Sequence, residues 1–207
     1  MNETTTSVSS SGPTDRRRQR GERTRNTILS SAVDLGSREG LESLTIGRLA
    51  SDIEISKSGL FAHFGSKEEL QLATVDAARE VFLREVVYPS SQVDEGLPRL
   101  RALLEAWISY FRRDVFPGGC FFQAASLEFD GRPGPVRQRV AEIMGDWLNL
   151  LTQLVEAAGV GAAPASQLAF EINAIGLATN WQHQLLGDDQ TFQQATNAFD
   201  RLIGSSR

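Results

Sequence analysis

The residues of this chain best suited to contact another molecule lie in one short segment, residues 56–67. Ser56 fits a helix N-cap, and the side chains that follow it are mostly small or polar. A short helix with such a tip can enter a DNA major groove, with donors beside it for phosphate oxygens. Lys67 stands just past this helix, where its ammonium group would reach a phosphate. The groove-facing candidates are Lys57, Ser58, Gly59, Phe61 and His63.

The single cysteine is the other candidate for chemistry. Cys120 stands between Gly119 and Phe121, and a cysteine hydrolase would need a partnered histidine. His63 belongs to the segment above, so Cys120 with His183 is the minor alternative, a thiol hydrolase. No basic residue is close to Cys120 in sequence, so a buried hydrophobe is the simpler interpretation, and any redox role stays open. One cysteine and two distant histidines lack metal-ligand spacing, so we expect no metal, no cofactor and no enzymatic activity.

Two short capped helices must position the candidate tip. Thr45 is an N-cap for the first, and apolar residues at i, i+3, i+4 and i+7 from Ile46 give that helix one buried stripe. Ser56 caps the second helix, in which Leu60 and Phe64 share one face. Two short helices joined by a few residues form a helix-turn-helix.

This region, roughly residues 23–72, resembles the DNA-binding domain of the TetR family of bacterial regulators. It departs from the family pattern at three positions. Phe61 stands where the family usually has Tyr, Glu54 where a turn glycine is common, and Gly36 where an aromatic residue usually fills the core. A second stretch, residues 118–137, resembles the regulatory domain of one branch of that family. The matching positions in the first region are Ile28, Leu29, Ala32, Gly40, Thr45, Leu49, Ala50, Ser56, Lys57, Leu60, Phe61, His63, Phe64, Ser66, Lys67 and Leu70.

The resemblance implies a homodimer that binds a palindromic operator and represses, or less often activates, nearby genes. It also implies a small apolar or amphipathic effector that releases the DNA; a DNA-binding regulator without an effector is the alternative. Together with the charge pattern, the resemblance gives as DNA-contact candidates Arg23, Thr45, Ile46, Ser56, Lys57, Ser58, Gly59, Leu60, Phe61, His63 and Lys67.

The net charge of the chain is negative, but the distribution of charge along the sequence is compatible with a nucleic-acid partner. The 207 residues carry a net charge of −5, but six arginines fall within residues 16–25. Such a cluster beside a helix-turn-helix favours a phosphate-binding arm. No apolar run reaches the roughly 18 residues of a membrane span, and the N-terminus lacks a signal-peptide core. One cysteine suits a reducing cytoplasm.

The helical periodicity predicts an all-α fold of about nine helices, with no strand pattern. We expect a disordered basic arm over residues 1–20, a helix-turn-helix domain over 21–66, and a helical regulatory and dimerisation domain over 67–207. Ser66 with Glu69 predicts a capping box at the start of the fourth helix, which we expect to end near Val87, before Pro89. The expected helices outside the helix-turn-helix are 21–39, 66–87, 98–113, 120–129, 135–158, 165–186 and 189–203.

Aromatic residues are more frequent after residue 97 than a bare helix bundle needs. Some of them are expected to line an apolar cavity with a few polar anchors, as ligand sites do; His183 is a further possible anchor. The ligand-site candidates are Trp107, Tyr110, Phe111, Phe122, Gln123, Trp147, Phe170, Asn173 and Trp181.

The last two helices carry apolar faces that suit either intramolecular packing or a homodimer built as a four-helix bundle. A lone recognition helix reads few base pairs, whereas a twofold dimer reads two half-sites about 34–36 Å apart or a multiple of that spacing. The dimer-face candidates are Leu168, Ile172, Ile175, Thr179, Phe192, Ala195, Phe199 and Leu202.

Overall fold

All regular secondary structure in the described part of the chain is helical. The computed structural model describes the backbone of residues 13–159 and 163–204, and side chains from residue 19 onward within these ranges. With the continuous α4, η1 and α5 counted as one, the described residues form nine helices. The elements are α1 (Pro13–Glu39), α2 (Ile46–Asp52), α3 (Lys57–Phe64), α4 (Lys67–Phe82), η1 (Leu83–Val87), α5 (Tyr88–Ser91), α6 (Leu97–Arg112), α7 (Phe121–Phe129), α8 (Pro135–Ala158), α9 (Ala165–Leu186) and α10 (Gln190–Gly204).

The helix-turn-helix forms as the capping residues predict. The Thr45 side chain accepts a hydrogen bond from the Arg48 N–H, and Ser56 accepts one from the Gly59 N–H. Ser66 likewise accepts from the Glu69 N–H, but the capping box is only half formed. The Ser66 N–H donates to the carbonyl of Phe64, so it is not available to the Glu69 carboxylate.

Helix α1 begins earlier than the sequence suggested. It starts at Pro13, not near Gly21, so residues 13–20 of the expected disordered arm are helical. Proline is favoured in the first turn of a helix, because its fixed φ suits the helix and its missing N–H leaves no unpaired donor there. Residues 1–12 of that arm lie outside the described residues.

The long helix that starts with α4 also runs past its expected end. It continues through Pro89 to Ser91 by way of the π-helical segment η1. Proline removes one N–H and crowds the preceding turn. In the wider π turn, the Tyr88 N–H bonds to the carbonyl of Leu83, five residues earlier, and the helix continues without a break.

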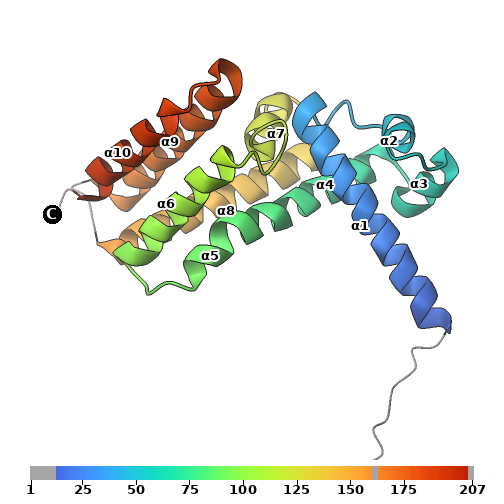
Figure 1. The fold of residues 1–207 in the computed structure, drawn as a ribbon, viewed down its shortest axis with the longest axis horizontal. Helices are drawn as coiled ribbons and strands as arrows, with labels where there is room; N and C mark the ends of the chain where they lie inside the picture. The colour runs from blue at the N-terminus through green and yellow to red at the C-terminus, as the bar shows by residue number, and fades with distance from the viewer. Residues whose placement is uncertain (1–12, 160–162, 205–207) are drawn as a thin grey trace, which may run out of the picture.

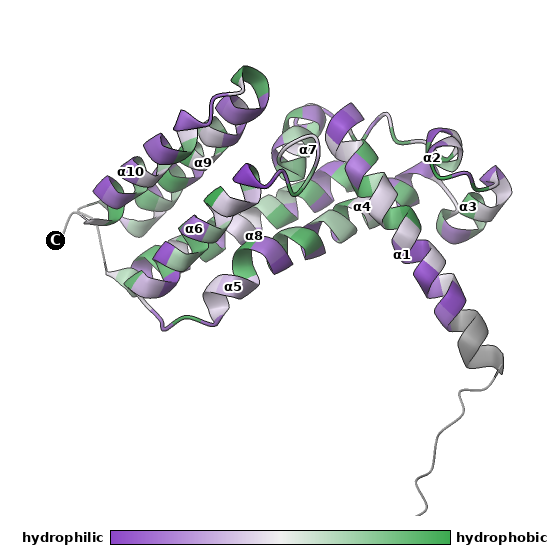
Figure 2. Ribbon diagram, viewed as in Figure 1, coloured by the Kyte–Doolittle hydropathy of each residue, from purple (hydrophilic) through white to green (hydrophobic). Residues whose placement is uncertain are grey.

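Helices α4 to α10 form a bundle around the central α8, which packs against α4, α6, α7 and α9. Figure 1 shows α2 and α3 at one end of the molecule and the α9–α10 pair at the other, with α4 running between. Apolar and polar residues are interspersed along the helices (Figure 2), and the buried apolar residues form one core that extends from α1 to α10. No helix in the described ranges has the length and apolarity that a membrane crossing requires.

Helix α7 crosses between the bundle and the end of α1. A Cβ on Gly36 would lie 3.3 Å from the Phe121 ring, so this ring occupies the space beside the glycine. A Cβ on Gly118 would overlap the backbone carbonyl of Ser37, and the Gly118 N–H donates to the Ser37 hydroxyl. The aromatic group that the family places at position 36 is thus supplied here by another helix.

Candidate nucleic-acid interface and effector cavity

Helix α3 presents one exposed face that suits a DNA groove. Lys57, Ser58, Phe61 and Ala62, at positions i, i+1, i+4 and i+5, are exposed. Phe61 is 57% exposed, which is unusual for a large aromatic residue and places an apolar ring where a thymine methyl group could contact it. The face is narrow and carries one cation, Lys57.

Two of the expected contact residues point the other way. Leu60 is fully buried in the apolar core, so it supports α3 and has no surface to offer DNA. Ile46 is partly buried and packs against the same core. Both follow from the amphipathic pattern of short helices, in which every third or fourth residue must face inward.

Lys67 is exposed only in part, and its ammonium group is already paired. Its Nζ lies 2.7 Å from a carboxylate oxygen of Glu42. The pKa of Glu42 is lowered, first by the hydrogen bond from Lys67. A phosphate contact by Lys67 would therefore share or replace this ion pair.

Two arginines of α1, Arg25 and Arg23, differ in their exposure and contacts near α3. Arg25 donates to the backbone carbonyl of His63 at 2.7 Å and lies over the Phe64 ring, so it fixes α1 to the end of α3. His63 itself is partly buried. Arg23 is exposed one turn before Thr27, whose hydroxyl bonds to the Arg23 carbonyl.

The turn between α2 and α3 contains a strained residue. Glu54 has φ of 56°, in the left-handed region that favours glycine. This geometry explains why glycine suits the position, as the departure noted in the sequence suggested. The strain lies two residues before the Ser56 cap.

A cavity of about 310 Å³ opens in the bundle, between α4, η1, α6, α7, α8 and α9. Its walls are largely aromatic and aliphatic, with a few amide groups. Phe82 packs edge-on against both Trp147 and Phe122, and the two indoles of Trp107 and Trp147 lie 4.8 Å apart. The lining residues are Arg79, Phe82, Leu83, Val87, Trp107, Cys120, Phe122, Gln123, Ile143, Met144, Asp146, Trp147, Leu150, Asn173 and Leu177.

Five of the nine ligand-site candidates line this cavity and four do not. Those that line it are Trp107, Phe122, Gln123, Trp147 and Asn173.

Of the remaining four, Tyr110 and Phe111 are buried beside a smaller void, behind the wall of the cavity. Phe170 and Trp181 are 65% and 50% exposed, on the outer side of α9. Aromatic content alone did not separate these positions, because α9 carries apolar residues on both sides.

The expected dimer face is also placed differently. Leu168, Ile172, Thr179, Phe192, Ala195 and Phe199 are buried within the chain, and Ile175 and Leu202 are partly buried against its core. These residues join α9 and α10 to the rest of the bundle, so in this structure they are not available to a second copy.

The Cys120 environment does not favour nucleophilic chemistry. Burial raises the pKa of the Cys120 thiol, so the nucleophilic thiolate is disfavoured. His183 pairs instead with Asp114 at 3.3 Å and with Asp189 at 3.1 Å. Among the described residues, no hydrogen bond links Cys120 to His183, and no group of His, Cys, Asp and Glu side chains is arranged to hold a metal ion.

The long fourth helix was expected to connect the cavity to the DNA-binding end, but a second connection, through α7, was not anticipated. The Glu128 carboxylate of α7 accepts hydrogen bonds from the Leu41 and Glu42 N–H groups, at 2.7 and 2.9 Å. Helix α7 also supplies Phe122 and Gln123 to the cavity wall. The signal in the sequence was Glu128, an acidic residue near the end of an otherwise apolar helix. Its partner is a loop 86 to 87 residues earlier in the chain, and residue spacing does not predict so distant a contact.

These features together define a DNA-binding regulator: a capped helix-turn-helix at one end and a helical domain with an apolar cavity behind it. The comparisons with known proteins give the family. The family description "Tetracyclin repressor-like, C-terminal domain" matches residues 96–199, and "Bacterial regulatory proteins, tetR family" matches residues 28–74. The chain belongs to the TetR family of bacterial transcriptional regulators.

Individual relatives agree with this assignment. The HTH-type transcriptional regulator TcmR of Streptomyces glaucescens is 34% identical over 67 residues, which are 32% of this chain and 30% of that protein. The match thus spans less than a third of that relative.

Solved structures share the fold over nearly the full length. A TetR-family regulator from Chloroflexus aurantiacus has 24% identity and a TM-score of 0.82, covering 91% of this chain and 98% of that one. SCO4454 from Streptomyces coelicolor has 20% identity and a TM-score of 0.77, covering 94% and 96%. AibR, solved with isovaleryl coenzyme A and operator DNA, has 19% identity and a TM-score of 0.69, covering 86% and 97%.

Proposed function

We propose that this regulator is a repressor that binds a palindromic operator as a homodimer and leaves it when a small molecule occupies the cavity. The observation that carries the proposal is the joining of the two ends of the molecule. Helices α4 and α7 both line the cavity, and both also contact the Leu41–Glu42 loop before α2, which leads to α3. A bacterial cytoplasm, where the DNA is, would be its place of action.

The homodimer face that we propose lies on the outer side of α9, in place of the buried residues expected from the sequence. Phe170, Ala174, Ala178, Trp181 and Leu185 are exposed and recur at helical spacing. Phe170, Trp181 and Leu185 are each at least half exposed. A contiguous apolar strip of this kind on a surface marks an interaction site. A second copy packed on the outer side of α9 would pair the two recognition helices about a twofold axis.

The coupling would run along two paths from the cavity. Arg79, Phe82 and Leu83 line it at the junction of α4 and η1, and α4 leads directly to Lys67. On the other side, α7 lines it through Phe122 and holds the Leu41–Glu42 loop through Glu128. A ligand that displaced either helix would move the start of α2.

Repression would be relieved by a shift in the spacing of the two recognition helices. An effector that binds more tightly to the conformation with the wrong helix spacing lowers operator affinity. The decrease is set by the difference between its affinities for the two conformations, and such coupling is typically about 1–3 kcal/mol, or 5–150-fold. The alternative of a regulator without an effector expects a cavity filled by side chains, and the open volume of about 310 Å³ supports the effector instead.

The direct test is selection of random duplex DNA by the purified full-length chain, followed by sequencing. We expect an inverted repeat whose half-sites are about one helical turn apart, or a multiple of it. Light scattering on the protein–DNA complex measures how many copies bind. Enrichment of a site without twofold symmetry, or of no sequence at all, would contradict the proposal.

A further inference from the structure

We infer that the cavity takes an uncharged, planar aromatic molecule that carries a carbonyl-type oxygen, a hydrogen-bond acceptor. This inference rests on the proposed effector role of the cavity and adds the chemistry of the ligand. It is carried by the hydrogen-bonding state of the groups in the wall.

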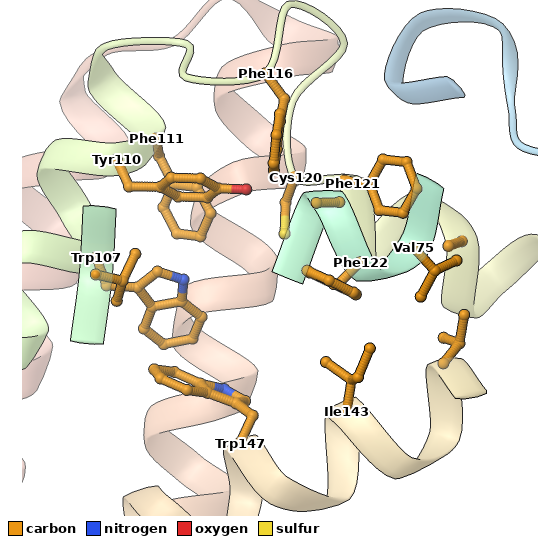
Figure 3. Close-up of a cluster of buried hydrophobic side chains, with 14 of the residues drawn as sticks. Val75, Trp107, Tyr110, Phe111, Phe116, Cys120, Phe121, Phe122, Ile143 and Trp147 are labelled. Atoms are coloured by element: carbon orange, nitrogen blue, oxygen red, sulfur yellow. The ribbon is translucent and has the colours of Figure 1, made fainter. Parts of the chain in front are cut away.

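The Trp107 indole provides a donor without a partner. Its side chain is 3% exposed, and its Nε1 has no hydrogen-bond partner among the described residues. A buried donor left unpaired costs about 1–3 kcal/mol, so it marks a place where an acceptor would bind. Figure 3 shows this nitrogen on the side of the indole that faces Cys120 and Phe122, two other residues of the cavity wall.

The indole is held in this orientation by close packing. A Cβ on Gly176 would overlap the six-membered ring of Trp107, at 2.1 Å from Cη2, so that edge of the indole lies directly on the α9 backbone. The pyrrole edge, which carries Nε1, must therefore face away from Gly176. The donor is positioned in advance, and a ligand need not reorder it.

A second donor comes from Asn173. Its Oδ1 accepts a hydrogen bond from Trp147 Nε1 at 3.1 Å. Because an indole nitrogen can only donate, the Trp147 contact fixes which end of the amide is the oxygen. The Asn173 Nδ2 group is then left as a donor, and no partner for it is found in the described residues.

The amide oxygens of the wall, in contrast, already accept hydrogen bonds. The Gln123 Oε1 accepts from Asn180 at 2.6 Å, and its Nε2 donates to the Leu177 carbonyl at 3.2 Å. The Asn173 oxygen is taken by Trp147. A ligand whose polar groups are donors would find no free amide oxygen, only the exposed Asp146 carboxylate, whereas one with an acceptor oxygen would find two donors.

The shape and charge of the cavity restrict the ligand further. The rings of Phe82, Trp107 and Trp147 offer aromatic faces and edges, which favour a flat aromatic partner. Two residues of the lining are charged: Arg79 is partly exposed and Asp146 is exposed, so neither provides a buried partner for a charged ligand. A volume of about 310 Å³ is at the lower end for ligand sites, which suits about two or three rings.

The test uses 9-fluorenone and fluorene, two compounds of the same shape that differ in one ketone oxygen. Binding to the full-length protein is measured by calorimetry. We expect fluorenone to bind several-fold more tightly than fluorene. Trp107→Phe, which retains an aromatic ring without the N–H, should weaken fluorenone by up to about tenfold and leave fluorene unchanged. Tyr88→Phe also removes a hydrogen-bonding group from an aromatic side chain, but on an exposed residue of α5 that does not line the cavity, so it is the matched control and should change neither affinity. Circular dichroism checks that both variants fold.

Three outcomes would overturn the inference: equal affinity for the two compounds, equal losses for both in Trp107→Phe, or no binding of either up to its solubility. A gel shift on the selected operator separates this failure from that of the proposed function. Fluorenone binding without DNA release would keep the ligand class and remove the effector role. Operator binding by a protein that ignores fluorenone would remove the ligand class alone.

Discussion

The Glu128 carboxylate accepts a hydrogen bond from the Leu41 backbone N–H at 2.7 Å, across 87 residues of sequence. It also accepts one from the neighbouring Glu42 N–H, so one side chain of α7 binds two successive N–H groups of the loop before α2. The same loop is held from α4, because the Gln71 amide donates to the Leu41 carbonyl at 2.8 Å. The DNA-binding end is thus attached to α7 and α4, two of the helices that border the cavity.

Replacing Glu128 tests this attachment. Glu128→Gln keeps one acceptor and loses the second and the charge, so we expect unfolding free energy to fall by about 1–2 kcal/mol. Operator affinity should also fall, because α2 and α3 would be held less firmly. Urea unfolding and a gel shift measure the two effects. Glu156→Gln, on the exposed side of α8, should change neither; equal behaviour of the two variants would remove the role assigned to Glu128.

Lys57 is the cation of α3 that is exposed in the absence of DNA. Lys57→Ala should weaken operator binding by about tenfold, roughly 1.4 kcal/mol, with little change in stability. The slope of log affinity against log salt should decrease by about one, as expected for the loss of one phosphate contact. Arg101→Ala, at the far end of α6, is the control. An unchanged affinity and slope would place the DNA elsewhere.

Lys67 should behave differently from Lys57. Because its ammonium group already pairs with Glu42 at 2.7 Å, Lys67→Ala removes an intramolecular ion pair as well as a phosphate contact. We expect weaker DNA binding, and partial recovery in the double variant with Glu42→Gln, which removes the unpaired carboxylate. Filter-binding titrations of the three proteins measure this coupling. Strict additivity of the two changes would show that the ion pair does not matter for binding.

The turn at Glu54 offers a stabilising change. At φ of 56° a non-glycine residue costs about 1–2 kcal/mol, part of which glycine loses again through its greater freedom in the unfolded chain. Glu54→Gly should therefore raise the unfolding free energy by about 0.5–1 kcal/mol in urea titrations. Asp114 also has positive φ, but it pairs with His183 and Gln184, so Asp114→Gly should not stabilise. Stabilisation by the second change alone would contradict this reasoning.

The pH dependence of stability should show the buried thiol. Burial raises the folded-state pKa of Cys120 above its ordinary value of 9.0. Below pH 9 both states hold the proton; above it, the unfolded chain loses its proton first, so stability falls as pH rises. Cys120→Ala should flatten the decline between pH 9 and 10 in thermal melts. Tyr110, whose pKa is also raised by burial, adds a later loss that this variant should retain. An identical decline in both proteins would exclude the thiol as its source.

Helix limits could be predicted from the sequence where proline or glycine residues flank the helix. Pro135 and Gly159 bound α8, and Pro164 and Gly187 bound α9, so both helices were predicted with their observed limits. The end of the continuous helix from α4 to α5 was not predicted, because the π turn of η1 lets the helix continue through Pro89, and no residue type in the sequence indicates such a turn.

The orientation of α9 was not readable either, for a related reason. Apolar residues occupy both sides of this helix: the side that includes Ile172 is buried, and the side that includes Trp181 is exposed. Periodicity identifies a helix and its stripes, but it cannot rank two apolar stripes when the neighbours that cover one of them are distant in sequence. The cavity candidates divided along the same line: Asn173 lines the cavity, whereas Phe170 points outward.

This division makes a sharp prediction for the homodimer. Trp181→Glu places a charge on the exposed strip of α9, where burial against a second copy would be costly, so we expect a folded monomer by light scattering. Phe199 was a dimer-face candidate from the sequence, but Phe199→Glu puts the charge in the core of the chain itself and should lower the melting temperature instead. Gln194→Glu, on the exposed side of α10, should do neither. Because dimerisation brings two recognition helices to one operator, Trp181→Glu should also reduce operator affinity steeply while leaving weak, salt-sensitive binding to any DNA. A Trp181→Glu protein that stays dimeric would move the interface to another face.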